Sequence, residues 1–219
     1  MGIMPTRSEL SLKRIPNKDV FIVHGADHTS LKELKTLLEG VGLNPIILHE
    51  QPSRGMTLIE KLEKYSNVGF AFIILTPDDV GIGQPEGEQM ILEITGKKNL
   101  TQEEVMEFFK THPQELVKLI AKTFDLFKQR ARQNVVLEFG YFIGKLGRGN
   151  VCCLYKGTIE LPSDMGGICF IHFENSGGIC FIHFENSISE VKEIIFKELK
   201  AVGYEVKSEE EEHTLSGSW

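Results

Sequence analysis

One glutamate in this sequence lies between bulky apolar residues, a setting that suits a reactive carboxylate. Asn134, Glu138, Tyr141 and Lys145 follow one another at spacings of four, three and four residues, so they share one face of a helix. Burial among apolar neighbours removes water from a carboxylate and raises its pKa, as a general acid, general base or nucleophile requires. From spacing alone, the more common outcome is a structural role, in which Glu138 forms an ion pair with Arg132 or Lys145.

Three polar, glycine-containing segments form the second group of candidate residues. They cover residues 24–30, 49–55 and 76–83, and each follows an apolar run that is typical of a strand. In parallel sheets, ligands bind beyond the carboxyl ends of the strands. We therefore expect a ligand to bind where these three segments meet.

Strands and amphipathic helices alternate along most of the chain. The expected strands cover residues 19–25, 45–48, 68–75 and 151–155, and the expected helices begin near 30 and 57 and cover 134–146 and 188–202. Ser30 with Glu33, and Thr57 with Glu60, have the spacing of capping boxes at helix N-termini. Such alternation predicts right-handed βαβ units, hence an α/β fold with a parallel sheet.

The alternation stops between about residues 83 and 128. A glycine-rich stretch is followed there by helical patterns at 101–110 and 113–128, which we interpret as an inserted helical hairpin. Its apolar residues must pack on the main domain or on a partner. Around this insertion we expect a flexible segment at 1–18, one domain over 19–206, and a disordered acidic tail at 207–219.

The segment GGICFIHFENS occurs twice in tandem, at residues 166–176 and 177–187. Both copies offer the same side chains in the same register, so either can supply an edge strand of the sheet. We expect one copy to pair at the edge and the other to form a hairpin or loop.

Composition excludes several classes of protein. A net charge of −7 argues against nucleic-acid binding, and no apolar run is long enough to span a membrane. The N-terminus has no apolar stretch of the kind found in secretory signals, so we expect a cytoplasmic protein. The four cysteines form no CxxC pair, and we interpret them as buried apolar residues. No metal-binding set and no P-loop motif is evident.

Five ordered stretches resemble the prokaryotic TIR-like domain family, predicted nucleotide-binding proteins that act as NAD-cleaving effectors of antiviral signalling. They read FIVHGAD, LNPIILHEQPSRGMTLIEKLE, VGFAFIILTPDDVG, ARQNVVLEFGYFIGKLGR and LYKGTIELPSD. The resemblance implies a flavodoxin-like sheet with helices on both faces. It also implies NAD⁺ hydrolysis, with the catalytic glutamate in the motif that reads NVVLEFG here, which is Glu138.

The resemblance also directs attention to residues that would contact the nucleotide. A glycine at a strand end lets backbone N–H groups approach a pyrophosphate, and an arginine can bind phosphate through two hydrogen bonds. The candidate substrate-binding residues are His24, Gly25, Asp27, Arg54, Gly55, Asp78 and Asn134. For His24 a hydrogen bond to backbone is an alternative role, and for Asp78 a turn-forming role.

The favoured hypothesis is therefore a TIR-type NAD⁺ glycohydrolase that uses NAD⁺ as substrate and needs no cofactor or metal. The resemblance implies a homo-oligomer on activation, in which the second loop of one molecule helps to complete the pocket of its neighbour. No sensor domain accompanies the five motifs, so we expect activation from outside the chain. Two alternatives stay open: a non-enzymatic TIR-like nucleotide-binding or protein-interaction module, and a nucleoside deoxyribosyltransferase-like enzyme.

Overall fold

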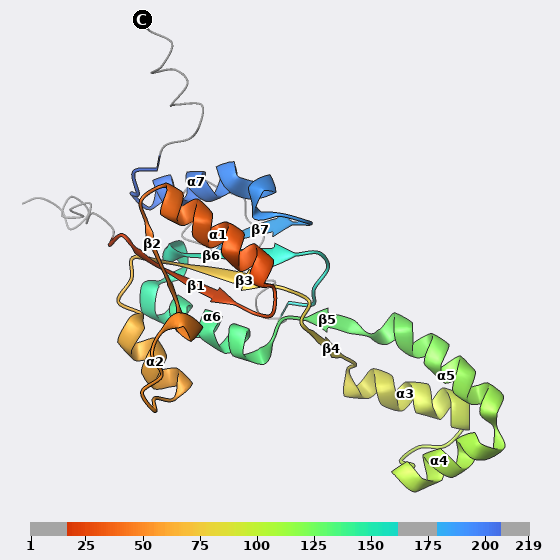
Figure 1. Ribbon diagram of the computed structural model, residues 1–219. Helices are drawn as coiled ribbons and strands as arrows, with labels where there is room; N and C mark the ends of the chain where they lie inside the picture. The colour runs from red at the N-terminus through yellow and green to blue at the C-terminus, as the bar shows by residue number, and fades with distance from the viewer. Residues whose placement is uncertain (1–16, 162–178, 207–219) are drawn as a thin grey trace, which may run out of the picture.

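A computed structural model describes residues 17–161 and 179–206, whose main body is a five-stranded parallel sheet between two layers of helices (Figure 1). The strands are β1 (Asp19–His24), β2 (Asn44–Ile47), β3 (Phe70–Leu75), β6 (Val151–Lys156) and β7 (Cys180–Phe184), in the order β2-β1-β3-β6-β7. Each neighbouring pair is parallel, so the carboxyl ends of all five strands lie at one edge. The α/β, flavodoxin-like fold expected from the sequence is confirmed.

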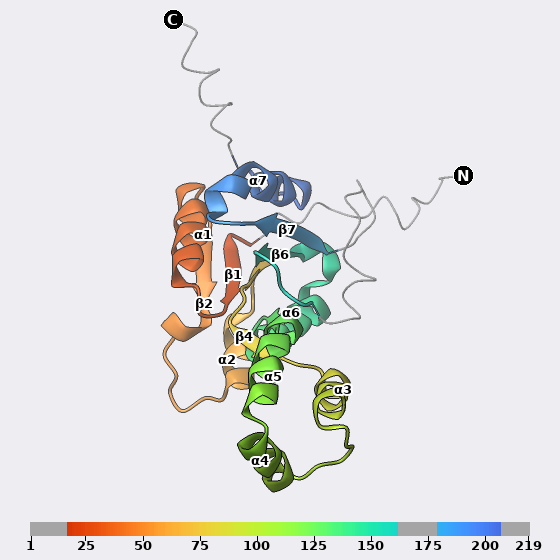
Figure 2. The same ribbon diagram turned by 90° about the vertical axis from the view of Figure 1, so that its right-hand side faces the viewer.

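Helices cover both faces of this sheet (Figures 1 and 2). One face carries α1 (His28–Gly40), the 3-10 helix Ile188–Val191 and α7 (Lys192–Ala201), and the other carries α2 (Leu58–Tyr65) and α6 (Gln133–Leu146). Two shorter 3-10 helices span Leu48–Glu50 and Arg148–Asn150. Phe142 of α6 packs on Phe21 of β1 with ring centroids 4.5 Å apart. This packing fixes the helix that bears Glu138 beneath the centre of the sheet.

The first helix begins earlier than its sequence pattern predicts. Asp27, not Ser30, is the N-cap, because its carboxylate accepts hydrogen bonds from the backbone amides of Thr29 and Ser30 at 3.0 Å each. Ser30 is buried inside α1, and Glu33 accepts hydrogen bonds from Ser187 and Ile188. The expected capping box at Ser30 is therefore wrong, whereas the one between Thr57 and Glu60 is confirmed.

The insertion is an arm of three helices, not the expected hairpin of two. It comprises α3 (Gln84–Thr95), α4 (Gln102–Thr111) and α5 (Pro113–Leu126), joined to the sheet by an antiparallel ribbon of β4 (Asp79–Gly81) and β5 (Lys128–Arg130). Pro85 and Gly87 made the first helix look like a loop, yet proline is well tolerated in the first turn. The arm projects away from the sheet, at the edge where the strands end (Figure 1).

Some expectations fall on residues outside the described ranges. These are most of the N-terminal segment, the acidic tail, Cys169 and the first copy of the repeat. Cys152 and Cys153 are buried, as expected, while Cys180 is partly exposed. Among the described residues, no helix combines the length and apolar character needed to cross a membrane.

The second copy of the repeat supplies β7, which lies at the edge of the sheet beside β6. Because the two copies are identical, removal of residues 166–176 or of 177–187 yields the same polypeptide. The shortened chain keeps a complete β7 and a connection of about a dozen residues, which is enough for a parallel crossover. We expect its melting temperature to stay within about 3 °C of the full chain.

Circular dichroism and thermal denaturation of the shortened chain measure this directly. Loss of cooperative unfolding would show that both copies of the repeat are required by the fold.

Candidate functional site

The loops that follow β1 and β2 are joined by a pair of histidines at the carboxyl edge of the sheet. His24 Nε2 lies 2.9 Å from His49 Nδ1, and His24 Nδ1 lies 2.8 Å from the carbonyl oxygen of Gly25. The ring of His28 is within 5.6 Å of the ring of His24, centroid to centroid. The expected backbone hydrogen bond of His24 is therefore present, together with partners that the sequence did not reveal.

The surroundings of His24 determine its protonation and the direction of its two hydrogen bonds. Burial lowers the pKa of His24, and the neighbouring His49 and His28 lower it further, so the ring is neutral near pH 7. A carbonyl oxygen only accepts, so His24 Nδ1 donates to Gly25 and His24 Nε2 accepts from His49 Nδ1. The ring of His24 thus lies at the site without a positive charge near pH 7.

Asp78 ties the first loop to the third. Its Oδ2 accepts a hydrogen bond from the backbone amide of Ala26 and its Oδ1 accepts one from Thr76 Oγ1, each at 2.8 Å. A Cβ atom on Gly25 would lie 1.7 Å from Asp78 Oδ2. Gly25 is therefore required by the close approach of Asp78, which has the turn-forming role that the sequence allowed.

Asp27 is held between the start of α1 and the end of β6. Its Oδ2 accepts hydrogen bonds from Ser30 Oγ at 2.8 Å and from Lys156 Nζ at 2.7 Å. Burial alone would raise the pKa of Asp27, but the hydrogen bonds from Lys156 and Ser30 outweigh it and lower the pKa to about 2. Lys156, which the sequence analysis missed, is placed here because it is the last residue of β6.

Glu138 is half-buried on α6, between turns that present the buried side chains of Val135, Phe139 and Phe142. Among the described residues, none donates a hydrogen bond or forms an ion pair with its carboxylate. Burial raises the pKa of Glu138 to about 7, far above that of an ordinary glutamate. At neutral pH this carboxylate is therefore divided between its protonated and ionised forms.

The two expected ion-pair partners of Glu138 point elsewhere. Lys145 is in the last turn of α6. It donates a hydrogen bond to Ser66 Oγ at 2.6 Å and lies 3.3 Å from Tyr141 OH. Arg132 Nε lies 4.0 Å from Asp78 Oδ2. The structural role in which Glu138 pairs with Arg132 or Lys145 is wrong, because each cation has another partner.

Three of the candidate substrate-binding residues are exposed, namely Arg54, Gly55 and Asn134. Arg54 and Gly55 have φ angles of 45° and 76°, a left-handed turn that glycine adopts readily and arginine seldom does. Within the described ranges, no side-chain hydrogen bond or ion pair of Arg54 or Asn134 is found. The structure thus brings His24, Gly25, Asp27 and Asp78 together, and among the described residues it shows no side-chain hydrogen bond or ion pair between them and Arg54 or Asn134.

The arm leaves the domain beside this site. Its β4 strand begins one residue after Asp78, and α6 begins at Gln133, shortly after β5 ends. Glu160 fastens the base of the arm, since its carboxylate pairs with Lys128 at 2.9 Å and with Arg130. The arm is thus anchored on both sides by segments that carry candidate site residues.

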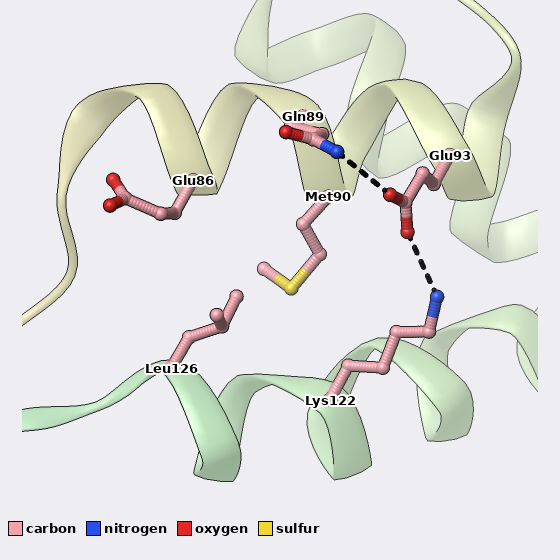
Figure 3. A pocket seen from close by; sticks show the side chains of 6 residues that line it. All are labelled: Glu86, Gln89, Met90, Glu93, Lys122 and Leu126. Atoms are coloured by element: carbon pink, nitrogen blue, oxygen red, sulfur yellow. Dashed lines mark hydrogen bonds and ion pairs between the residues drawn. The ribbon is translucent and has the colours of Figure 1, made fainter.

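A cavity of about 350 Å³ lies within the arm, between α3 and α5 (Figure 3). Its lining residues are Glu86, Gln89, Met90, Glu93, Lys122 and Leu126. Since none of them follows a strand of the main sheet, the cavity is separate from the site described above. Among the described residues, no group of three or more His, Cys, Asp or Glu side chains is arranged to hold a metal ion.

The raised pKa of Glu138 has a measurable effect on stability. Between pH 4.5 and about 7 the folded state binds more protons than the unfolded state, so this residue makes stability fall as pH rises. We expect Glu138→Gln to be more stable than the wild type at pH 8, by about 1 to 2 kcal/mol once solvent screening is allowed for, and to gain little at pH 4.

Chemical denaturation at the two pH values measures this difference. Glu63→Gln, at an exposed position of α2, is the matched control. An equal effect of Glu138→Gln at both pH values would contradict the burial of a titrating carboxylate.

Most of this chain is similar to known proteins. The model of the family described as "CAP12/Pycsar effector protein, TIR domain" matches residues 19–175, and this match ends inside the first copy of the repeat. The uncharacterized protein YuaY of Escherichia coli strain K12 is 35% identical over 167 residues, which are 76% of this chain and 43% of YuaY. Protein tirC of Dictyostelium discoideum is 34% identical over 161 residues, which are 70% of this chain and 63% of tirC. The chain thus spans less than two thirds of either relative.

Proposed function

This chain belongs to the TIR-domain family of CAP12/Pycsar effector proteins, and we propose that it cleaves the bond between nicotinamide and ribose in NAD⁺. Glu138 is the catalytic carboxylate of this proposal, and a defence or signalling pathway is its setting. The single observation that carries the proposal is a half-buried glutamate with a pKa of about 7 and no cationic partner among the described residues.

A carboxylate in this state suits the cleavage of an N-glycosidic bond. When the bond between C1′ and the pyridinium nitrogen breaks, its electron pair leaves with neutral nicotinamide and C1′ becomes an oxocarbenium-like cation. A poorly hydrated carboxylate stabilises such a cation strongly, because little water screens it and no neighbouring cation competes for it. We assign this role to Glu138.

Water completes the reaction. It adds its oxygen to C1′, releases one proton and yields ADP-ribose. A carboxyl group with a pKa of about 7 can accept that proton near neutral pH, where general bases are most effective. The departing nicotinamide is neutral, so no separate general acid is needed.

The loops at the strand ends are the proposed binding site for the rest of NAD⁺. The pyrophosphate would lie along the first loop. The amides of Ala26, Thr29 and Ser30 already donate to Asp78 and Asp27, so the exposed Arg54 is the group that remains to bind phosphate. Asp78 keeps the first loop in place. The ring of His24 is neutral and is held by Gly25 and His49, so it lines the site without adding a fixed charge. No resident cofactor or metal enters this scheme.

Arg54 is the proposed outer contact, toward a phosphate of NAD⁺ or toward a neighbouring molecule in a homo-oligomer. Its side chain is exposed, so its removal costs the fold little. We expect Arg54→Ala to raise KM for NAD⁺ by about tenfold, the effect of losing one charge-assisted contact, and to leave the melting temperature unchanged.

Steady-state kinetics and sedimentation test Arg54 against Arg148→Ala, which replaces an exposed arginine beyond the far end of α6. If KM and self-association of Arg54→Ala both match the wild type, Arg54 has no part in the site.

Two incubations separate this function from its alternatives. Concentrated protein is mixed with NAD⁺, or with deoxyadenosine and a free pyrimidine base, and the products are resolved by chromatography. We expect nicotinamide from the first mixture and no exchange in the second. Exchange of bases would favour a deoxyribosyltransferase, and two unchanged mixtures would favour a non-enzymatic interaction module.

A further inference from the structure

Two cysteines lie side by side on the last two strands of the sheet. Cys152 of β6 is the register partner of Cys180 of β7, and the two thiols are hydrogen-bonded to each other. Both side chains belong to the face of the sheet that α1 and α7 cover. Cys153, the next residue of β6, lies on the opposite face, as the alternation of side chains along a strand requires. The sheet therefore brings Cys152 and Cys180 into contact on one face.

The spacing of the two strands permits a disulfide between these cysteines. Neighbouring strands lie about 4.8 Å apart, so the Cα atoms of register partners fall within the range of about 4.4 to 6.8 Å that disulfides span. Their Cβ atoms must come closer than in an undistorted sheet, since a disulfide holds them about 3.8 Å apart. β7 can make this shift, because it is an edge strand that pairs, among the described strands, with β6 alone.

The two thiols differ in their access to solvent. Cys152 is fully buried, and burial raises the pKa of its thiol well above the usual range. Cys180, the first residue of β7, is partly exposed. A dissolved oxidant therefore reaches Cys180 first, while Cys152 lies beside it and out of contact with solvent. An accessible thiol next to a second thiol that can complete a disulfide is the arrangement found at redox-sensitive cysteines.

We propose that Cys152 and Cys180 form a redox modification site, which a low-molecular-weight disulfide such as oxidised glutathione converts to an intramolecular disulfide. Cys180 attacks one sulfur of the small disulfide, forms a mixed disulfide with it and releases one small thiol. Cys152 then attacks the Cys180 sulfur, so the bond between the two cysteines forms and the second small thiol leaves. The two cysteines lose two electrons, which reduce the small disulfide, and their two protons leave on the two released thiols.

The new bond fastens the edge strand to the rest of the sheet. β7 leads directly into the segment that contacts α1, where Ser187 and Ile188 donate hydrogen bonds to Glu33. A covalent link between β6 and β7 restricts the opening of this edge. The strain of the shortened Cβ distance makes the disulfide easy to reduce, so the link is reversible. This site does not depend on the proposed catalytic function.

The tandem repeat provides a matched control. Cys169 has the same position in the first copy as Cys180 has in the second, within eleven identical residues. Glu174 lies between them, so cleavage after glutamate places the two cysteines in different peptides. Mass spectrometry can therefore distinguish a disulfide to one copy from a disulfide to the other.

Peptide mapping of the full chain tests the proposal. The folded protein is incubated with oxidised glutathione, the remaining thiols are alkylated, and fragmentation of the linked peptides distinguishes Cys152 from Cys153. In the wild type and in Cys169→Ser we expect a bond between Cys152 and Cys180 that dithiothreitol removes. Cys180→Ser should lose this bond and leave Cys152 unmodified, because a buried thiol is inert by itself. The wild-type map carries the assignment without any variant.

Three results would overturn the proposal. One is a wild type that is folded by circular dichroism and forms no internal disulfide in a large excess of oxidised glutathione. Another is a bond that joins Cys152 to Cys169 in preference to Cys180, or that persists undiminished in Cys180→Ser. The third is a bond that forms only in concentrated urea, where the chain is unfolded and the register of the strands plays no part.

Discussion

Glu138→Gln should reduce the release of nicotinamide from NAD⁺ by a factor on the order of 10³. Glutamine keeps the size and the helical tolerance of glutamate, so α6 should remain folded. What it loses is the negative charge that stabilises the cation at C1′ and the group that accepts a proton from water. The loss should therefore appear in kcat, with KM for NAD⁺ changed much less.

Two controls accompany this variant. Glu63→Gln, at an exposed position of α2, should retain full activity. Thermal denaturation should show that Glu138→Gln is at least as stable as the wild type at pH 8, because an ionised, half-buried carboxylate has been removed. Retention of more than a few per cent of wild-type activity by a folded Glu138→Gln would end the assignment of Glu138 as the catalytic carboxylate.

Gly25→Ala should have the second-largest effect. The added methyl group would lie 1.7 Å from Asp78 Oδ2, so the carboxylate must move and release the backbone amide of Ala26. Loss of this hydrogen bond and the strain from the added methyl group should lower the free energy of unfolding by about 1 to 3 kcal/mol. Because the first loop would shift with it, we expect a fall in kcat/KM of about tenfold to a hundredfold.

Gly40→Ala is the control for this substitution. Gly40 ends α1 and has no heavy atom within 4 Å of an added Cβ, so alanine should be neutral or slightly stabilising there. Equal melting temperatures and activities for the two alanine variants would show that the contact between Gly25 and Asp78 does not organise the site.

The sheet and its central helix follow from local sequence patterns. The apolar runs of β1 and β3 and the mixed face of α6 each specify their element within a few residues, because burial on both faces of a parallel sheet demands such runs. Glu138 stands out for the same reason, as a carboxylate in an otherwise apolar stretch. That Glu138 has no ion-pair partner among the described residues did not follow from spacing, since Arg132 and Lys145 both lie within two helical turns of it in the sequence.

Contacts between distant segments account for what the sequence did not reveal. His24 and His49 meet only because β1 and β2 are adjacent and in register, and Asp27 meets Lys156 only because the chain returns to the same edge after 129 residues. A pattern of apolar residues likewise cannot predict that the arm of α3, α4 and α5 projects away from the sheet. The pattern shows which residues are apolar, but only the fold shows that Val117, Ile120 and Phe124 of α5 are exposed.

The central claim is that this chain cleaves NAD⁺ at the nicotinamide–ribose bond. Its most direct test is chromatography of NAD⁺ incubated with concentrated wild-type protein, with nicotinamide and the ADP-ribosyl product quantified over time. We expect the two products to appear together and in equal amounts as NAD⁺ disappears. NAD⁺ that remains intact with folded protein at several hundred micromolar, a concentration at which weak assemblies form, would contradict the account.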